Sequence, residues 1–225
     1  MYNNCLVIGA GGTGSHLIPS LARLLSYHPN FDGIVMVCDG DDFEDRNRER
    51  QHFTHSGNKA EAMVGFCRLL GLQGVHATTK YLSERNAKRI LDGNSIVVAC
   101  VDNDQTRKIC CDHFTDTDQD FFFITPGNST GDEIKVSVPY WGHIDGKTVG
   151  CNPALVYPNI ENPADNAPTG GDCINQAPSQ PQLITANAIA ATTTLALLQN
   201  LLDGTLQPKT SAVHACGRTF KTSYA

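Results

Sequence analysis

Short runs of apolar residues alternate along the first half of the chain with longer segments in which apolar residues recur every three or four positions. The runs predict buried strands at 5–8, 34–38, 75–80, 96–100 and 121–125, and the periodic segments predict helices around 15–27, 59–70, 84–91 and 106–114. Unbroken β-branched runs such as Ile96-Val97-Val98 are typical of a parallel sheet that is buried on both faces. Strands and helices in alternation predict an α/β fold with a doubly wound, mostly parallel sheet.

The pattern changes after about residue 127. Residues 134–138 alternate between apolar and polar, which predicts an antiparallel strand with one face in solvent, added to the sheet in the C-terminal half. Residues 150–181 are rich in Pro, Asn, Gly and Asp, and their lack of periodicity predicts a long loop. An apolar helix is expected over 183–202, where it either packs into the core or contributes to a subunit interface. The tail at 212–223 predicts a final strand or hairpin.

Composition narrows the classes of function. A length of 225 residues suits one domain with a proper core. The net charge of −6 and the lack of a lysine- or arginine-rich stripe argue against a nucleic-acid partner. No apolar run is long enough to span a bilayer and no secretory leader is recognisable, so we expect a cytoplasmic protein without a membrane partner. The nine cysteines are expected to be reduced, and no zinc is expected because paired C-x-x-C motifs are lacking.

A glycine-rich turn lies between the first predicted strand and the first predicted helix, in the segment Gly9-Ala10-Gly11-Gly12-Thr13-Gly14-Ser15. Glycines let the backbone turn sharply and approach a phosphate, and the N–H groups at the start of a helix attract negative charge. The spacing predicts a Rossmann-like nucleotide site. Its candidate cofactor-binding residues are Gly9, Gly11, Gly12, Gly14 and Ser15. By itself the motif does not say which nucleotide binds.

Further polar residues follow the other predicted strands. They are Asp39, Asp41, Asn47, Arg50 and Gln51 after the second strand, Lys59 at the start of the next helix, and Asp102 and Asn103 after strand 96–100. An acid at the tip of the second strand is where a dinucleotide fold holds a ribose hydroxyl. Because strand ends in an open α/β sheet meet at one crevice, we expect cations, amides and acids around a nucleotide phosphate.

These motifs, in this order, resemble those of the ThiF/MoeB/HesA family of the ubiquitin-activating-enzyme-like adenylyltransferase superfamily. The matching residues are Gly9, Gly11, Gly12, Gly14, Asp39, Asp41, Asn47, Arg50, Gln51, Lys59, Asp102, Asn103 and Arg107. The likeness is strong over the first half and weaker through Cys173 and the following helix. It implies one ThiF-type adenylation domain over 1–225, with a nucleotide-binding half at 1–126 and antiparallel strands, a long loop and a final helix at 127–225.

The resemblance also implies an activity, cofactors and partners. Members of this family adenylate the C-terminal carboxylate of a small ubiquitin-like protein or peptide, with ATP and Mg²⁺. They pair through their adenylation domains, so a homodimer is expected. The implied roles are phosphate contacts for Arg50 and Lys59, support of the phosphates by Asn47 and Gln51, ribose binding by Asp39 and Mg²⁺ binding by Asp102. Asp41 and Asn103 are counted among the nucleotide-binding residues.

The chemistry fits those residue types. The attacking carboxylate is already ionised at neutral pH, so the reaction needs no general base. The difficulty is electrostatic, because an anion must attack a polyanion. Cationic donors and Mg²⁺ reduce the repulsion and stabilise the departing pyrophosphate. Mg²⁺ commonly uses one or two carboxylates together with substrate phosphates, so Asp102 alone would suffice.

Cys173 is a candidate for a second step. It lies in the segment Gly170-Gly171-Asp172-Cys173, ahead of the final helix. In ThiF-like proteins a cysteine at a similar place takes part in acyl or sulfur transfer, so the resemblance implies that Cys173 captures the adenylated carboxylate. An exposed thiol near a helix N-terminus is a better nucleophile than a buried one. The plainer alternative is a thiol that packs under the loop.

Other readings stay open at this point. Arg50 taken alone is a solvated surface arginine, Lys59 a helix-face lysine, and Asp102-Asn103 a cap for the helix near Thr106. An NAD-dependent oxidoreductase would keep the glycine turn but would not explain Arg50, Lys59 and Asp102 together. A nucleotide-binding scaffold or pseudoenzyme that docks a ubiquitin-like partner is a further alternative, because family members carry an N-terminal helix whose arginine reaches the partner subunit's site, and this sequence begins almost directly at its first strand.

Overall fold

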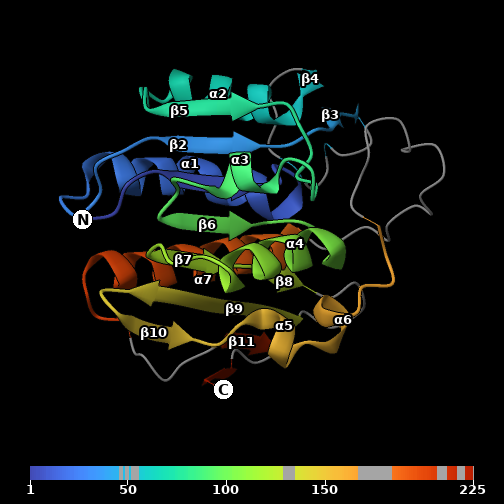
Figure 1. Cartoon of the computed structure of the whole chain (residues 1–225). Helices are drawn as coiled ribbons and strands as arrows, with labels where there is room; N and C mark the ends of the chain where they lie inside the picture. The colour runs from blue at the N-terminus through green and yellow to red at the C-terminus, as the bar shows by residue number, and fades with distance from the viewer. Residues whose placement is uncertain are drawn as a thin grey trace.

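A single large sheet runs through the computed structural model (Figure 1). It has ten strands, eight of which lie in the order β12-β11-β9-β7-β6-β1-β2-β5, while β8 and β10 pair with β9. The structure describes residues 1–45, 48, 51, 56–128, 135–166 and 184–206, together with the backbone of 212–216 and 221–224. Strands β3 and β4 form a separate two-stranded sheet.

The elements follow one another in a regular order. They are β1 (Cys5–Ile8), α1 (Gly12–Tyr27), β2 (Val35–Cys38), β3 (Asp42–Phe43), β4 (Gly57–Asn58), α2 (Lys59–Leu69), β5 (Val75–Thr78), α3 (Ala87–Leu91), β6 (Ile96–Ala99), α4 (Asp104–Thr115), β7 (Phe121–Ile124), β8 (Gly127–Asn128), β9 (Lys135–Ile144), β10 (Lys147–Gly150), α5 (Pro153–Val156), α6 (Pro158–Glu161), α7 (Ile184–Leu202), β11 (Ala212–Cys216) and β12 (Lys221–Tyr224).

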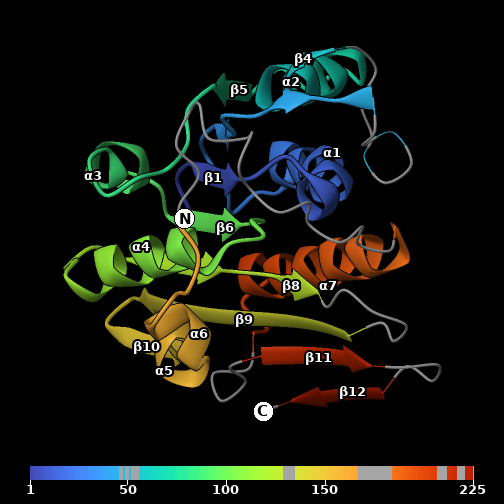
Figure 2. The same cartoon turned by 90° about the vertical axis from the view of Figure 1, so that its right-hand side faces the viewer.

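Helices cover both faces of the sheet. Figure 2 shows α1 and α7 on one side and α3 and α4 on the other. Side chains of one strand point alternately to the two faces, so Cys5 and Val7 of β1 belong to the core under α1 and α7, whereas Leu6 and Ile8 belong to the core under α4. Every residue of β1 is buried, as the continuous apolar run requires.

The predicted fold class is confirmed. Strands β5, β2, β1, β6 and β7 are parallel neighbours, and β9 pairs antiparallel with β7, β8, β10 and β11. The strand expected at 134–138 is longer than the alternation indicated and extends to Ile144. The tail forms the antiparallel hairpin of β11 and β12.

Two expectations about elements were wrong. The helix predicted at 84–91 starts only at Ala87, because the Asn86 side chain accepts a hydrogen bond from the Ser83 backbone N–H and donates one to the Tyr81 carbonyl, which holds the preceding residues in a turn. The segment predicted as one long loop contains α5 and α6. Each of these begins with proline, whose fixed φ suits the first position of a helix. Residues 167–181 of that loop lie outside the described residues.

Helix α7 belongs to the core. It packs against α1 and β9, and nine of its residues are buried. Of the two roles open to this helix, the structure shows core packing. Four cysteines that lie in or directly after strands and helices, at positions 5, 38, 67 and 100, are buried thiols, and burial raises the pKa of Cys67 to about 11 and that of Cys100 to about 12. Over the described part of the chain, no helix combines the length and apolar character needed to cross a membrane.

The topology places three loops side by side. Strand β1 lies between β2 and β6, and all three run in the same direction. Their carboxyl ends therefore deliver the glycine turn at Gly9, the acid Asp39 and the loop that carries Asp102 to one edge of the sheet. Ligands of open α/β sheets bind outside this edge.

Candidate nucleotide site

The glycine turn is held tightly against the end of β6. Gly9 has φ +90°, which side chains of L-residues rarely adopt, and a Cβ on it would lie 2.5 Å from the carbonyl oxygen of Cys100. A Cβ on Gly14 would lie 2.0 Å from the carbonyl oxygen of Gly9. Backbone packing therefore requires glycine at both positions, and these close contacts fix the conformation of the turn.

The start of α1 faces the carboxyl edge of the sheet without a cap of its own. Gly11 is the N-cap and offers no side-chain hydrogen bond, and the first turn carries no acidic residue. Ser15 is buried, its N–H bonds the Gly11 carbonyl, and its hydroxyl donates to the Gly12 carbonyl. The N–H groups of the first turn and the positive end of the helix dipole thus remain available to an anion.

Gln51 lies across from this helix start. Its amide nitrogen is 3.8 Å from the position that a Cβ on Gly11 would occupy. Its Oε1 is buried and has no hydrogen-bond partner among the described residues. Buried polar atoms in proteins are nearly always hydrogen-bonded, so an unpartnered acceptor beside an uncapped helix start fits a site that a ligand completes.

Asp39, at the end of β2, is tied to the glycine turn. Its carboxylate accepts the backbone N–H of Ala10 at 2.7 Å and that of Asp41 at 2.8 Å. Burial raises the pKa of the Asp39 carboxyl, and the charge of Lys59 and the two N–H donors act against this rise without cancelling it. Asp39 thereby fixes the turn from β2 relative to the turn from β1.

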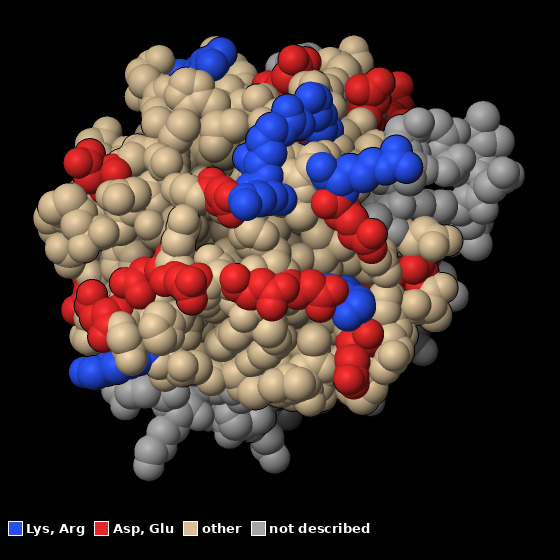
Figure 3. Space-filling model, in the orientation of Figure 1, with Lys and Arg blue, Asp and Glu red and all other residues tan. Residues whose placement is uncertain are grey.

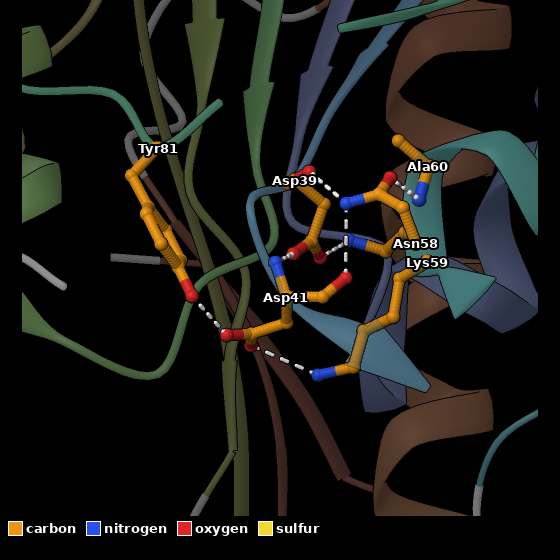
Figure 4. A network of polar contacts seen from close by, with 7 residues as sticks. Asp39, Asp41, Asn58, Lys59, Ala60 and Tyr81 are labelled. Atoms are coloured by element: carbon orange, nitrogen blue, oxygen red, sulfur yellow. Dashed lines mark hydrogen bonds and ion pairs between the residues drawn. The ribbon is translucent and has the colours of Figure 1, made fainter. Parts of the chain in front are cut away.

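Lys59, the first residue of α2, carries a buried cation at this edge. Its Nζ lies 2.9 Å from Asp41 Oδ2, and the hydroxyl of Tyr81 donates a short hydrogen bond to Asp41 Oδ1 (Figure 4). Burial would raise the pKa of Asp41, but the charge of Lys59 and the hydrogen bonds from Tyr81 and Lys59 outweigh it and hold that pKa below its usual value. The ion pair with Asp41 therefore fixes the Lys59 side chain at this edge of the sheet.

Asn58 organises the same network from the residue before Lys59. Its Nδ2 donates to the carbonyl oxygens of Asp39 at 3.0 Å and Asp41 at 3.1 Å, while its Oδ1 caps α2 by accepting the N–H of Ala60 at 2.9 Å (Figure 4). An asparagine cap is among the most favourable helix starts. The cap therefore fixes the helix that carries Lys59 to the loop that carries both aspartates.

Tyr81→Phe tests whether the phenol supports this network. We expect the variant to lose about 1 kcal/mol of unfolding free energy at pH 7, a modest value because Asp41 is partly exposed to solvent. Because the pKa of Asp41 is lower in the folded protein than in the unfolded chain, the ionised carboxylate stabilises the fold at pH values above the unfolded pKa. This stabilisation is lost as the pH falls through the folded pKa. The cost should therefore be constant from about pH 8 to 5 and shrink below about pH 4. Urea unfolding at several pH values measures it, and a cost that grows towards acid would contradict it.

Asp102 follows β6 at the same edge and is exposed to solvent. The next residue, Asn103, caps α4 by accepting the N–H of Thr106 at 2.8 Å, which was the plainer of the two readings of this segment. Arg107 has a supporting role, since its guanidinium bonds Asp104, the Thr125 hydroxyl and the Val101 carbonyl. The loop that presents Asp102 is thus anchored on both sides, and a nucleotide contact by Asn103 stays a prediction.

The carboxylates at this edge of the sheet could bind Mg²⁺ only together with oxygen atoms of a bound substrate. Over the described residues there is no group of three or more His, Cys, Asp or Glu side chains that could hold a metal by itself. Mg²⁺ keeps several waters and binds one or two carboxylates together with phosphates. The exposed carboxylate of Asp102 lies at the same sheet edge as the uncapped start of α1 and fits that mode.

Three predicted site residues, Asn47, Arg50 and Cys173, lie outside the described residues. Among the others, the structure brings Gly9, Gly11, Gly12, Gly14, Ser15, Asp39, Asp41, Gln51, Lys59, Asp102 and Asn103 to the carboxyl edge of the sheet. Sequence reasoning missed Asn58 and Tyr81. The position of Asn58 directly before a helix is a recognisable cap signal, whereas nothing in the sequence marks Tyr81, whose ring packs over Gly40.

The surface away from this edge carries both signs of charge. Figure 3 shows the face covered by α3 and α4, where carboxylates form a row across the middle and lysine and arginine side chains gather above them. This face is therefore not uniformly basic, as a surface that binds nucleic acid would be.

Comparisons with known proteins identify both a family and a set of similar folds. The model of the ThiF family matches residues 2–202. The crystal structure of E. coli MccB with ATP has 17% sequence identity and a TM-score of 0.70, over 99% of this chain and 63% of that one. The crystal structure of E. coli MccB with MccA-N7isoASN has 18% sequence identity and a TM-score of 0.72, over 99% of this chain and 64% of that one. The crystal structure of selenomethionine PaaA has 15% sequence identity and a TM-score of 0.64, over 99% of this chain and 63% of that one.

At these identities the likeness concerns the fold. This chain spans slightly less than two thirds of the length of each of these three structures. A search of curated protein sequences finds no match.

Proposed function

Because this chain belongs to the ThiF family, we propose that it is an ATP-dependent adenylyltransferase that activates a C-terminal carboxylate. The acceptor we propose is a peptide or a small ubiquitin-like protein. One observation carries the proposal: a buried ammonium ion, Lys59, is fixed at the sheet edge where the uncapped start of α1 and the acids Asp39 and Asp102 also lie. A dinucleotide oxidoreductase has no need of this cation and this exposed acid together.

In the proposed reaction the acceptor carboxylate attacks the α-phosphorus of ATP. A bond forms from a carboxylate oxygen to phosphorus, the bond from phosphorus to the pyrophosphate oxygen breaks, and pyrophosphate leaves with its electron pair. The N–H groups of Gly12 and Thr13 at the start of α1 bind phosphate oxygens. Lys59 has three N–H donors, so it can keep Asp41 and still contact a phosphate. Its charge reduces the repulsion between the two anions.

The remaining residues orient the nucleotide. Asp39 has a second lone pair on each carboxylate oxygen, so it can accept a ribose hydroxyl while it holds the Ala10 N–H. Gln51 can donate to a phosphate oxygen through its side-chain amide nitrogen, the atom that lies towards Gly11. Bound Mg²⁺ would neutralise phosphate charge, and Asp102 is the residue that would hold it. Arg50 and Asn47 are proposed to support the phosphates.

Three further points of the proposal rest on family resemblance. The MccB structures with ATP and with MccA are consistent with the nucleotide and with a peptide-like acceptor. The proposed homodimer follows from pairing in the resembling enzymes. Capture of the adenylated carboxylate by Cys173 is the finer proposal, and adenylation itself does not depend on it.

ATP–pyrophosphate exchange tests the activity directly. With Mg²⁺ and peptides or small proteins ending in Gly-Gly as acceptors, we expect label from pyrophosphate to enter ATP. Calorimetry should show ATP binding at least about ten-fold more tightly than NAD, because Lys59 and the helix start favour the more highly charged polyphosphate. Tight binding of NAD without binding of ATP would support the oxidoreductase alternative. Binding of ATP without exchange for any acceptor would support a scaffold.

A further inference from the structure

Helix α7 carries a buried amide at the level of the glycine turn. Asn187 has no exposed surface and lies within an otherwise apolar stretch of the helix. Its Oδ1 accepts two hydrogen bonds, from the Thr13 hydroxyl at 3.2 Å and from the Asn128 side chain at 2.7 Å. One side chain therefore joins α7 to the second residue of α1 and to β8.

The same amide occupies the space beside Gly12. A Cβ on Gly12 would lie 2.5 Å from Asn187 Nδ2 and 2.8 Å from both its Cγ and its Oδ1. Gly12 is not among the glycines with positive φ, so its backbone conformation alone does not demand glycine. The demand comes from α7, 175 positions further along the chain.

Packing alone does not account for this asparagine. Its Nδ2 is buried and has no hydrogen-bond partner among the described residues, an arrangement that is unfavourable for a buried donor. An apolar residue of similar size would fill the same space without that cost. The two hydrogen bonds that the amide accepts are what such a residue would lose, and both act on groups at the start of α1 or beside it.

We propose that Asn187 is a positioning residue of the nucleotide site, whose amide sets the place of Gly12 and Thr13 and so aims the N–H groups at the start of α1. This inference rests on the proposed function, because it concerns the part of α1 that binds phosphate. Glycine at position 12 and asparagine at position 187 then form one steric and hydrogen-bonding unit. It makes the C-terminal half of the fold part of the phosphate-binding turn.

A double-mutant cycle tests the pair. The variants are Gly12→Ala, Asn187→Ala and the two combined, with ATP affinity measured by calorimetry and stability by urea unfolding. We expect Gly12→Ala to weaken ATP binding at least about ten-fold, and the double variant to bind ATP at least about three-fold more tightly than Gly12→Ala, because removal of the amide makes room for the methyl group.

Two controls separate this effect from general damage. Gly14→Ala also weakens binding, but its clash is with the backbone carbonyl of Gly9, so Asn187→Ala should not rescue it. Thr194→Val alters another fully buried polar residue of α7, whose hydroxyl bonds only within the helix, to Ala190, as far as the structure describes it. It should leave ATP affinity within about two-fold of wild type.

The outcomes are distinct. If the fold-losses in ATP affinity of the two single variants simply multiply in the double variant, the inference is overturned. It is also overturned if the Asn187→Ala protein is less stable but binds ATP with unchanged affinity. If Gly12→Ala does not fold, folding of the double variant is itself the rescue, and failure of both contradicts the pair. Wild-type protein that binds no ATP would refute the proposed function. Wild-type protein that binds ATP, with fold-losses in affinity that multiply in the double variant, would refute this inference alone.

Discussion

Replacing Asp102 with asparagine is expected to lower ATP–pyrophosphate exchange by about 100-fold or more, while the protein stays folded. The amide has nearly the same shape as the carboxylate, but it carries no charge and is a weak ligand for Mg²⁺. Asp102 is exposed, so the substitution should change stability by no more than about 0.5 kcal/mol. A loss of exchange can then be assigned to the site rather than to unfolding.

The comparison for this variant is Asp112→Asn. Asp112 lies on α4 and forms a surface ion pair with Lys108. The Asp112→Asn variant therefore removes the same charge as Asp102→Asn, but away from the glycine turn. Its exchange rate should equal that of the wild type. Exchange by Asp102→Asn at the wild-type rate, over a range of Mg²⁺ concentrations, would remove Asp102 from the mechanism.

Lys59→Met should have an effect of similar size on exchange, about 100-fold or more, and should also weaken ATP binding. The variant keeps the length of the apolar stem but removes the ammonium ion that faces the phosphates in the proposed mechanism. It also removes the ion pair between Lys59 and Asp41, so a loss of about 1–2 kcal/mol of stability is expected, reduced from the value for a fully buried pair by the partial exposure of Asp41.

Lys108→Met is the matched control, because Lys108 forms an exposed ion pair of the same type with Asp112. It should change neither exchange nor, by more than about 0.5 kcal/mol, the stability. ATP calorimetry, pyrophosphate exchange and urea unfolding measure the three effects. If Lys59→Met lowers stability yet binds ATP as tightly as the wild type, Lys59 is only a structural ion-pair residue and the proposed phosphate contact is wrong.

Much of the fold was readable from local patterns. Runs such as Ile96-Val97-Val98 predict buried parallel strands because a strand covered by helices on both faces has no polar side, and the structure confirms β6 within the sheet. The start of α3 was misjudged because Asn86 bonds the preceding turn, which is a contact that periodicity does not record. The helices α5 and α6 were missed because each spans only four residues.

For the candidate site, too, part was found from the sequence and part only from the structure. Gly9, Asp39, Lys59 and Asp102 were found from the sequence because each follows a strand or opens a helix, and parallel strands bring such positions to one edge whatever the loops contain. Their placement at that edge is what the structure adds, while their roles towards a nucleotide stay proposals.

What the sequence determined by itself was the alternation of the main strands and helices, the parallel sheet and the edge at which polar residues collect, because these follow from periodicity and from strand direction. The tertiary structure alone decided which side chains meet there. The hydroxyl of Tyr81 reaches Asp41 across 40 positions, and the amide of Asn187 reaches the start of α1 across 174. Such contacts depend on how helices and loops pack over the sheet, and no pattern along the chain encodes a distance between residues so far apart.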